Sequence, residues 1–446
     1  MTIVEQAGRG HLLRILGVGF GVAVAIGGMI GSGILRTPNL MALDVPSIPI
    51  ILGLWLLGAI DAALGVNVFA EMAAAIPSAG GAYDYARRTF GDVLGLIVGW
   101  SNWLACLAGI AAAAISFSNF LPLIWPATAS HTTGVSLGIL FALFGANLLG
   151  LREGRALQES TSFIKAIMLV AFCIAAALFT PAVQVPTHAS MAHALGLAGI
   201  VGAYQLVRGA YAGWESPVYF GEETVNPGLV IPRAMLAGLV FTSLLYLCVN
   251  AALLYALGLD GTAASPLPFT AVLAYLGSAA GPLFALTAMI TVASCANSNI
   301  MSAPRIMYAM AEHGLLPSAF SWVSKGGSPY VALGLTALVA IGLALSGAFE
   351  IVFGLIGTMI GVMGIVVTAA LFAARRREPG LARPFMAIGY PYLPALWLIL
   401  QLVLLLLFSI SDVRGILFAV GLSLACIPLA LIARRGKAAR DRQPNP

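Results

Sequence analysis

Charged residues are scarce in this sequence. Asp, Glu, Lys and Arg together make up 9% of its 446 residues, whereas 60% of the residues are apolar. An ordinary soluble domain has about one-quarter charged residues, so the composition excludes a soluble protein. It also excludes intrinsic disorder, which requires low hydrophobicity and high charge. The net charge of +5 does not indicate nucleic-acid binding, because the basic residues are scattered over loops and the C-terminal tail.

Catalytic and metal-binding motifs are missing as well. The sequence has no Walker-type loop (GxxxxGK followed by Ser or Thr), so ATP is not expected to drive this protein directly. It has no HExxH, no GxSxG and no Cys/His cluster with zinc spacing. The five cysteines all lie inside apolar runs, which leaves no disulfide framework in the loops. We therefore expect no enzyme activity, no metal and no cofactor.

Long apolar runs fill most of the chain. A membrane-spanning helix takes about 20 residues, and the runs predict about twelve such helices with short connections. On this basis we expect an all-α polytopic membrane protein. With the N-terminus placed inside, eighteen of the 22 Lys and Arg residues fall in inner loops and tails. The positive-inside rule then puts both termini in the cytoplasm.

Two of the apolar runs are interrupted. The first contains Gly-Gly-Met-Ile-Gly-Ser-Gly at residues 27–33, and the sixth contains Gly-Ala-Tyr-Ala-Gly-Trp-Glu-Ser-Pro at residues 209–217. Glycine lowers the cost of non-helical backbone, and Pro217 removes a backbone donor. Each interrupted run opens a group of five spans, and because five is odd the two groups cross the membrane in opposite senses. Such matched interruptions point to the binding site of an inverted-repeat transporter.

The chemistry of an interrupted helix suits a zwitterion. Free N–H groups at the start of a half-helix favour a carboxylate, and unwound carbonyls favour an ammonium group. Close helix packing by small residues is the alternative explanation for either glycine cluster alone. Both clusters together, with Glu215 beside the second, favour a binding site.

Four blocks of sequence resemble the amino acid–polyamine–organocation (APC) transporters, particularly bacterial amino-acid permeases near the L-type branch. The blocks are residues 26–38 (IGGMIGSGILRTP), 70–91 (AEMAAAIPSAGGAYDYARRTFG), 211–233 (YAGWESPVYFGEETVNPGLVIPR) and 294–317 (SCANSNIMSAPRIMYAMAEHGLLP). The resemblance implies a LeuT-like 5+5 inverted repeat with helices 1 and 6 broken and two C-terminal helices appended. The segments expected from it are a cytoplasmic N-terminal segment 1–14, a first repeat 15–181, an inverted second repeat 195–374, helices 11 and 12 in 388–433, and a basic cytoplasmic tail 434–446.

The same resemblance implies a set of site residues. The substrate-binding residues would be Met29, Ile30, Gly31, Ser32 and Gly33 in the first interruption and Gly209, Ala210, Tyr211, Ala212, Gly213 and Trp214 in the second. The amides of residues 31–33 would hold a carboxylate, while the carbonyls of Met29 and Ala212, and less surely Gly209, would receive an ammonium group. Relatives often have an aromatic lid where this chain has Gly209. Either Tyr204, Tyr211 or Trp214 closes the pocket instead, or the pocket is wider.

Ionisable residues inside the predicted spans are candidates for coupling and selectivity. Lys165 matches a lysine that takes the place of a sodium ion in some relatives, although a lysine extending to the headgroups is an alternative. Glu215 is either a proton-coupling carboxyl or a packing residue. Arg208 either pairs with one of the two available carboxylates, Asp61 or Glu215, or meets an anionic substrate.

Other polar residues complete the expected machinery. Trp103, Ser294 and Asn297 are further candidates for recognition of the substrate side chain. Rim residues predicted to form salt bridges are Glu71, Arg87, Arg88, Glu222, Glu223, Arg233 and Arg305.

The expected function is secondary active transport of an amino acid across the cytoplasmic membrane by alternating access, as a proton symporter or an exchanger. The expected partners are the amino acid and the bilayer, with no nucleic acid. No disulfide-linked heavy chain is expected, because the outer loop that bears the linking cysteine in eukaryotic L-type relatives has none here. The alternatives are a polyamine or amine carrier of the same fold and, with less support, an amino-acid sensor that does not transport.

Overall fold

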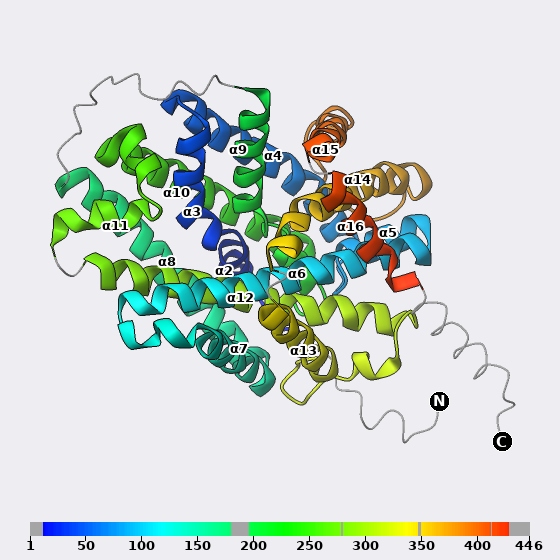
Figure 1. The fold of residues 1–446 in the computed structure, drawn as a ribbon. Helices are drawn as coiled ribbons and strands as arrows, with labels where there is room; N and C mark the ends of the chain where they lie inside the picture. The colour runs from blue at the N-terminus through cyan, green and yellow to red at the C-terminus, as the bar shows by residue number, and fades with distance from the viewer. Residues whose placement is uncertain (1–11, 180–195, 278–279, 347–348, 412, 428–446) are drawn as a thin grey trace, which may run out of the picture.

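The fold is built from helices. The computed structural model describes residues 12–179, 196–277, 280–346, 349–411 and 413–427. Within these ranges the only strand-like pairing is a single parallel bridge between Leu16 and Thr224. The expected all-α class is therefore confirmed for the part of the chain that the structure describes (Figure 1).

The described residues form a succession of α-helices. In chain order they are α2 (Val18–Met29), α3 (Ser32–Asp44), α4 (Ile48–Ala75), α5 (Ala82–Phe90), α6 (Asp92–Phe120), α7 (Thr132–Leu149), α8 (Leu151–Phe179), α9 (Leu197–Tyr211), α10 (Pro227–Ala264), α11 (Pro268–Leu273), α12 (Ala280–Glu312), α13 (Tyr330–Ser346), α14 (Phe349–Arg377), α15 (Tyr392–Ser411) and α16 (Val413–Leu424). A 3₁₀-helix, η3, covers Ser216–Phe220. The long α10 is kinked at Gly258, whose φ is +67°.

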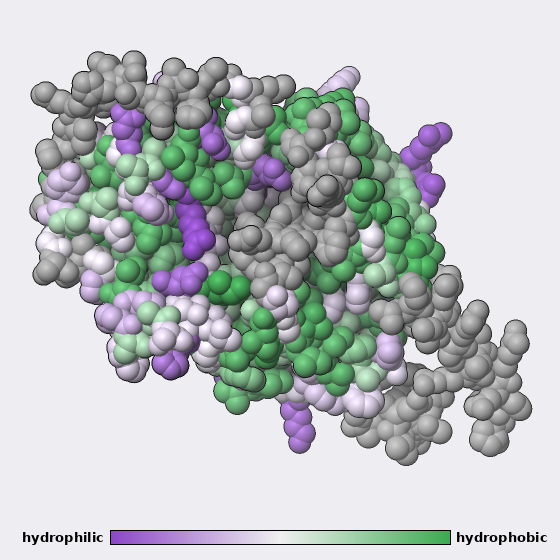
Figure 2. Space-filling model, in the orientation of Figure 1, coloured by the Kyte–Doolittle hydropathy of each residue, from purple (hydrophilic) through white to green (hydrophobic). Residues whose placement is uncertain are grey.

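Nine helical segments in the described residues are long and apolar enough to cross a membrane, with α2 and α3 counted together as one. Helix α13 is apolar but shorter. In the view of Figure 2, hydrophobic residues cover much of the described surface. These features indicate a multi-pass membrane protein. The predicted tail 434–446, the end of the last predicted span and residues 1–11 lie outside the described residues.

The interrupted first helix lies at the centre of the bundle. Helices α6 and α12 pack along each other, and α4 packs against α10. Between these pairs, α2 contacts α8, α10 and α12, whereas α3 contacts α9 and α10 (Figure 1). The first interruption is therefore surrounded by helices that can supply partners to its free backbone groups.

Candidate functional site

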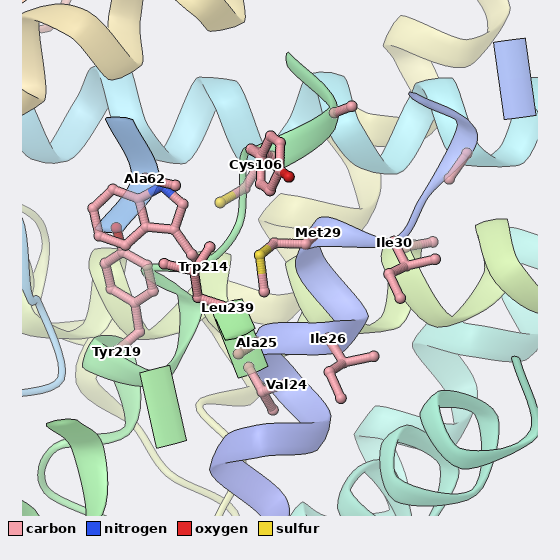
Figure 3. Packing of buried hydrophobic residues seen from close by; sticks show 14 of the residues in the cluster. Val24, Ala25, Ile26, Met29, Ile30, Ala62, Cys106, Trp214, Tyr219 and Leu239 are labelled. Atoms are coloured by element: carbon pink, nitrogen blue, oxygen red, sulfur yellow. The ribbon is translucent and has the colours of Figure 1, made fainter. Parts of the chain in front are cut away.

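Both predicted interruptions are present. Helix α2 ends at Met29 and α3 begins at Ser32, with Ile30 in extended backbone (ψ 92°) between them. Figure 3 shows the ribbon of α2 leaving the helix at Met29 and Ile30. Helix α9 ends at Tyr211, and a non-helical turn precedes η3. The turn includes Gly213, whose φ of +107° lies in the region that favours glycine.

The two interruptions touch each other backbone to backbone. A Cβ atom added at Gly33 would lie 2.9 Å from the Cα atom of Ala210. A Cβ atom added at Gly213 would lie 2.5 Å from the carbonyl carbon of Gly28. Only glycine allows approaches this close, so the two glycine clusters join the interrupted helices to each other.

Lys165 supplies hydrogen bonds to the carbonyl end of α2. Its side chain is 0% exposed, and its Nζ atom lies 3.2 Å from the Gly27 carbonyl oxygen and 2.7 Å from that of Ile30. The last carbonyls of a helix have no partner within the helix, so the ammonium group satisfies acceptors that the interruption frees. The side chain therefore does not extend to the headgroups, and its part in coupling stays a prediction.

Tyr246 on α10 joins the two interruptions and was not identified from the sequence. Its hydroxyl lies 2.8 Å from the Met29 carbonyl oxygen and 2.9 Å from that of Ala210. Its ring packs against the rings of Trp55 and Tyr211, at centroid distances of 5.1 and 5.2 Å. The one available signal was a tyrosine hydroxyl in a mainly apolar run, which also contains Thr242 and Ser243. That signal does not say which backbone group the hydroxyl meets.

Cys295 on α12 also contacts the first interruption. The side chain is half-buried, and its Sγ atom lies 3.5 Å from the Gly28 carbonyl oxygen. A Cβ atom at Gly31 would lie 2.9 Å from the same sulfur. Helix α12 therefore reaches both sides of the first interruption through one thiol.

The amide end of α3 faces accessible space. Ser32 and Gly33 are half-buried, and Gly31 provides no side-chain cap for the first amides of the helix. Gly209 in the opposite interruption is exposed, and a Cβ atom there would meet nothing within 4 Å. Unpaired amides at a helix start attract a negative charge. Whether the pocket is wider at Gly209 or another aromatic residue closes it stays a prediction.

The three residues predicted to recognise a side chain already have protein partners. Ser294 Oγ lies 3.3 Å from Gln158 Nε2, and Asn297 Nδ2 donates to Gln158 Oε1 at 2.9 Å, which ties α12 to α8. Trp103 Nε1 donates to Thr336 Oγ1 at 3.2 Å, which ties α6 to α13. The structure thus gives these residues contacts between helices, and their part in selectivity stays a prediction.

Glu215 and Arg208 flank the second interruption and have different partners. A Glu215 carboxylate oxygen accepts a hydrogen bond from the Gly213 amide at 3.1 Å, inside the turn. Arg208 Nε lies 3.5 Å from Asp61 Oδ2, so of its two predicted roles the ion pair is the one present. Tyr204, a candidate lid, donates to Asp61 at 3.1 Å.

The predicted rim ion pairs are largely present. Arg305 donates from Nε to Glu223 Oε2 at 2.5 Å and from Nη2 to Glu223 Oε1 at 2.8 Å. Arg375 Nη2 lies 2.6 Å from Glu71 Oε2. Further pairs join Arg88 to Glu378 and Arg87 to Asp92.

Two of the predicted rim residues have other surroundings. The Glu222 carboxylate accepts from the Ala79 amide, and burial raises the pKa of Glu222. Arg233 is exposed. Among the described residues, no group of three or more His, Cys, Asp or Glu is placed to hold a metal ion.

The sequence is similar to known proteins over most of its length. The family model described as "Amino acid permease" matches residues 21–425. The serine/threonine exchanger SteT of Bacillus subtilis is 27% identical, over 96% of this chain and 98% of its own length. The branched-chain amino acid permease BcaP of the same organism is 25% identical, over 97% and 96%. The lysine-specific permease LysP of Lactococcus lactis is 26% identical, over 93% and 87%.

Proposed function

Because the chain belongs to the amino acid permease family, we propose that it carries an amino acid across the cytoplasmic membrane by alternating access between two interrupted helices. Its relatives include an exchanger and permeases for amino acids. The observation that supports the proposed site most directly is the direct contact between the backbones of residues 28 and 213 and of residues 33 and 210.

The proposed binding site uses the peptide groups of the two interruptions. The accessible amides at Ser32 and Gly33 lie at the positive end of α3 and suit the carboxylate of a substrate. The Met29 carbonyl uses one of its two lone pairs for Tyr246, which leaves the other for an ammonium group. Ligands common to every amino acid would then bind the backbone, while the space at Gly209 would receive the side chain.

The order of elements supports an inverted repeat. The first half runs as interrupted helix, α4, short α5, α6, α7 and α8. The second half runs as interrupted α9 and η3, α10, short α11, α12, α13 and α14. The same sequence of long and short helices thus occurs twice. We propose that these halves are the two repeats, that α15 and α16 are the appended helices, and that both termini are cytoplasmic.

The position of Lys165 suggests how the carrier works without sodium. A fixed ammonium group occupies the carbonyls of Gly27 and Ile30, which a bound cation would otherwise neutralise. We therefore propose proton-coupled symport or exchange, in which replacement of sodium by choline leaves uptake unchanged.

Uptake by purified protein in proteoliposomes tests the proposed function. We expect accumulation of at least one radiolabelled amino acid, with competition by others and no inhibition by sodium removal. Liposomes without protein are the control. Stimulation by acid outside would identify symport, and dependence on internal amino acid would identify exchange. Uptake of polyamines without competition by amino acids, or amino-acid binding without uptake, would contradict the proposal.

Replacement of Glu215 by Gln is expected to flatten the pH profile of uptake. The Gln amide oxygen still accepts from the Gly213 amide, so the turn keeps its hydrogen bond while the titratable group is lost. The profile of initial uptake rate against pH measures the change, and Glu153→Gln at an exposed position is the matched control. An unaltered profile in Glu215→Gln would leave Glu215 with a structural role alone.

A further inference from the structure

Asp61 lies in the middle of α4 and collects donors from two other helices. Its Oδ1 atom accepts from Trp397 Nε1 at 2.8 Å and from Gln401 Nε2 at 2.9 Å, both on α15. Its Oδ2 atom accepts from the Tyr204 hydroxyl at 3.1 Å and lies 3.5 Å from Arg208 Nε, both on α9. One carboxylate therefore joins three helices.

The contacts form a closed ring of buried polar groups. Arg208 also donates to the Gln401 side-chain oxygen, so Arg208, Gln401 and Asp61 each contact the other two. The side chains of Arg208 and Asp61 are 9% and 7% exposed. A buried charge that loses its partner is strongly unfavourable, which makes either residue depend on the other.

The cluster of Asp61, Arg208 and Gln401 lies beside the second interruption. Arg208 immediately precedes the interruption, and Trp214 lies inside it, in the turn between α9 and η3. Trp214 packs beside Trp397, with ring centroids 6.4 Å apart, and a Cβ atom at Gly65 would contact both rings. A cavity of about 20 Å³ is lined by Asp61, Arg208 and Gln401 together with Ala212.

The opposite side of the same interruption faces the first one. Ala210 contacts Gly33, and Gly213 contacts Gly28. The α4 and α15 side therefore holds the interrupted segment in place, while the other side presents its peptide groups to α2 and α3. A shift of Arg208 or Trp214 would move those peptide groups.

We propose that Asp61 is a positioning residue that sets the geometry of the second interruption, through Arg208 immediately before it and through Trp397, which packs beside Trp214 within it. Arg208 serves this arrangement and does not contact the substrate. The inference rests on the proposed function, because it concerns the same site. In this proposal, the appended helix α15 holds the second interruption against α4 through Trp397 and Gln401.

A double-mutant cycle tests the proposal on the purified full-length protein. The variants are Asp61→Asn, Arg208→Gln and the double variant, each compared for KM, for maximal rate and for melting temperature in detergent. We expect each single variant to raise KM by about tenfold or more, because it leaves a buried charge unpaired. The double variant is expected to recover part of the loss, because neither charge remains.

Two further variants keep the test informative if a charge variant does not fold. Trp397→Phe keeps an aromatic side chain but removes the N–H donor to Asp61 and part of the indole's packing, so we expect a rise in KM in the same direction. Asn67→Ala is the matched control, because Asn67 lies on α4, the helix that carries Asp61. It removes the hydrogen bonds of Asn67 to the Ile388 backbone, away from the interruption, and is expected to lower the melting temperature without raising KM.

Defined outcomes would overturn the inference. Additive effects of Asp61→Asn and Arg208→Gln on KM and on melting temperature would show that the pair is not coupled. A change in the relative uptake of acidic and neutral amino acids in Arg208→Gln would show that Arg208 contacts the substrate. If wild-type protein transports no amino acid, the proposed function fails, while the cycle in melting temperature still decides whether the pair is coupled.

Discussion

Lys165→Met is expected to abolish uptake while the protein still reaches the membrane. The substitution keeps the apolar stem and removes the ammonium group that bonds the carbonyls of Gly27 and Ile30. Each buried acceptor left without a donor costs about 1–3 kcal/mol. A loss of about 3 kcal/mol corresponds to roughly a hundredfold change in an equilibrium constant. The measurement is the initial rate of uptake per amount of protein in the membrane.

Two variants accompany Lys165→Met. Lys325→Met removes an exposed lysine in a loop and is expected to leave uptake unchanged. Lys165→Arg keeps the charge but introduces a larger planar group, so we expect it to recover little of the activity. Uptake by Lys165→Met at the wild-type rate would show that the first interruption does not need this ammonium group.

Gly213→Ala is expected to reduce uptake at least as strongly. The φ of +107° at Gly213 is strained for any L side chain, at a cost of about 1–2 kcal/mol. The added Cβ atom would also lie 2.5 Å from the Gly28 carbonyl carbon, so the two interruptions must move apart. Because the proposed ligands are peptide groups of these two segments, substrate affinity is expected to fall as well. A binding assay with the transported amino acid and an uptake assay together measure both effects.

Gly202→Ala is the matched control, because Gly202 lies in α9 but outside the interruption. Its added Cβ atom would meet nothing within 4 Å, so we expect near wild-type uptake. Equal losses in Gly202→Ala and Gly213→Ala would mean that the close approach at Gly213 is not what matters. Normal uptake in Gly213→Ala would remove direct contact between the interruptions from the mechanism.

The helix interruptions could be predicted because their cause is local. Glycine density and Pro217 change the backbone preferences of the residues that carry them, whatever surrounds them. Lys165 was also accessible to sequence reasoning, because its place in the chain matches a family position. Its alternative role as a residue extending to the headgroups depended on burial, which the sequence does not contain.

Contacts between distant residues were not accessible in the same way. Tyr246 lies 217 positions from Met29 along the chain, and nothing in its own segment indicates that its hydroxyl meets the Met29 carbonyl. Ser294 and Asn297 were assigned to side-chain recognition, whereas the structure pairs both with Gln158 on α8. Residue type indicated that these groups need partners but did not identify the partners.

Composition and pattern by themselves determined the membrane class, the two interruptions and the candidate residues beside them. These follow from hydrophobicity and backbone preference, which act over a few neighbouring residues. Only the tertiary structure decided that Arg208 pairs with Asp61 rather than Glu215, and that α15 joins them through Gln401. The physical reason is that a buried charge takes the partner that helix packing brings within a few ångströms, and that distance depends on how the whole chain folds.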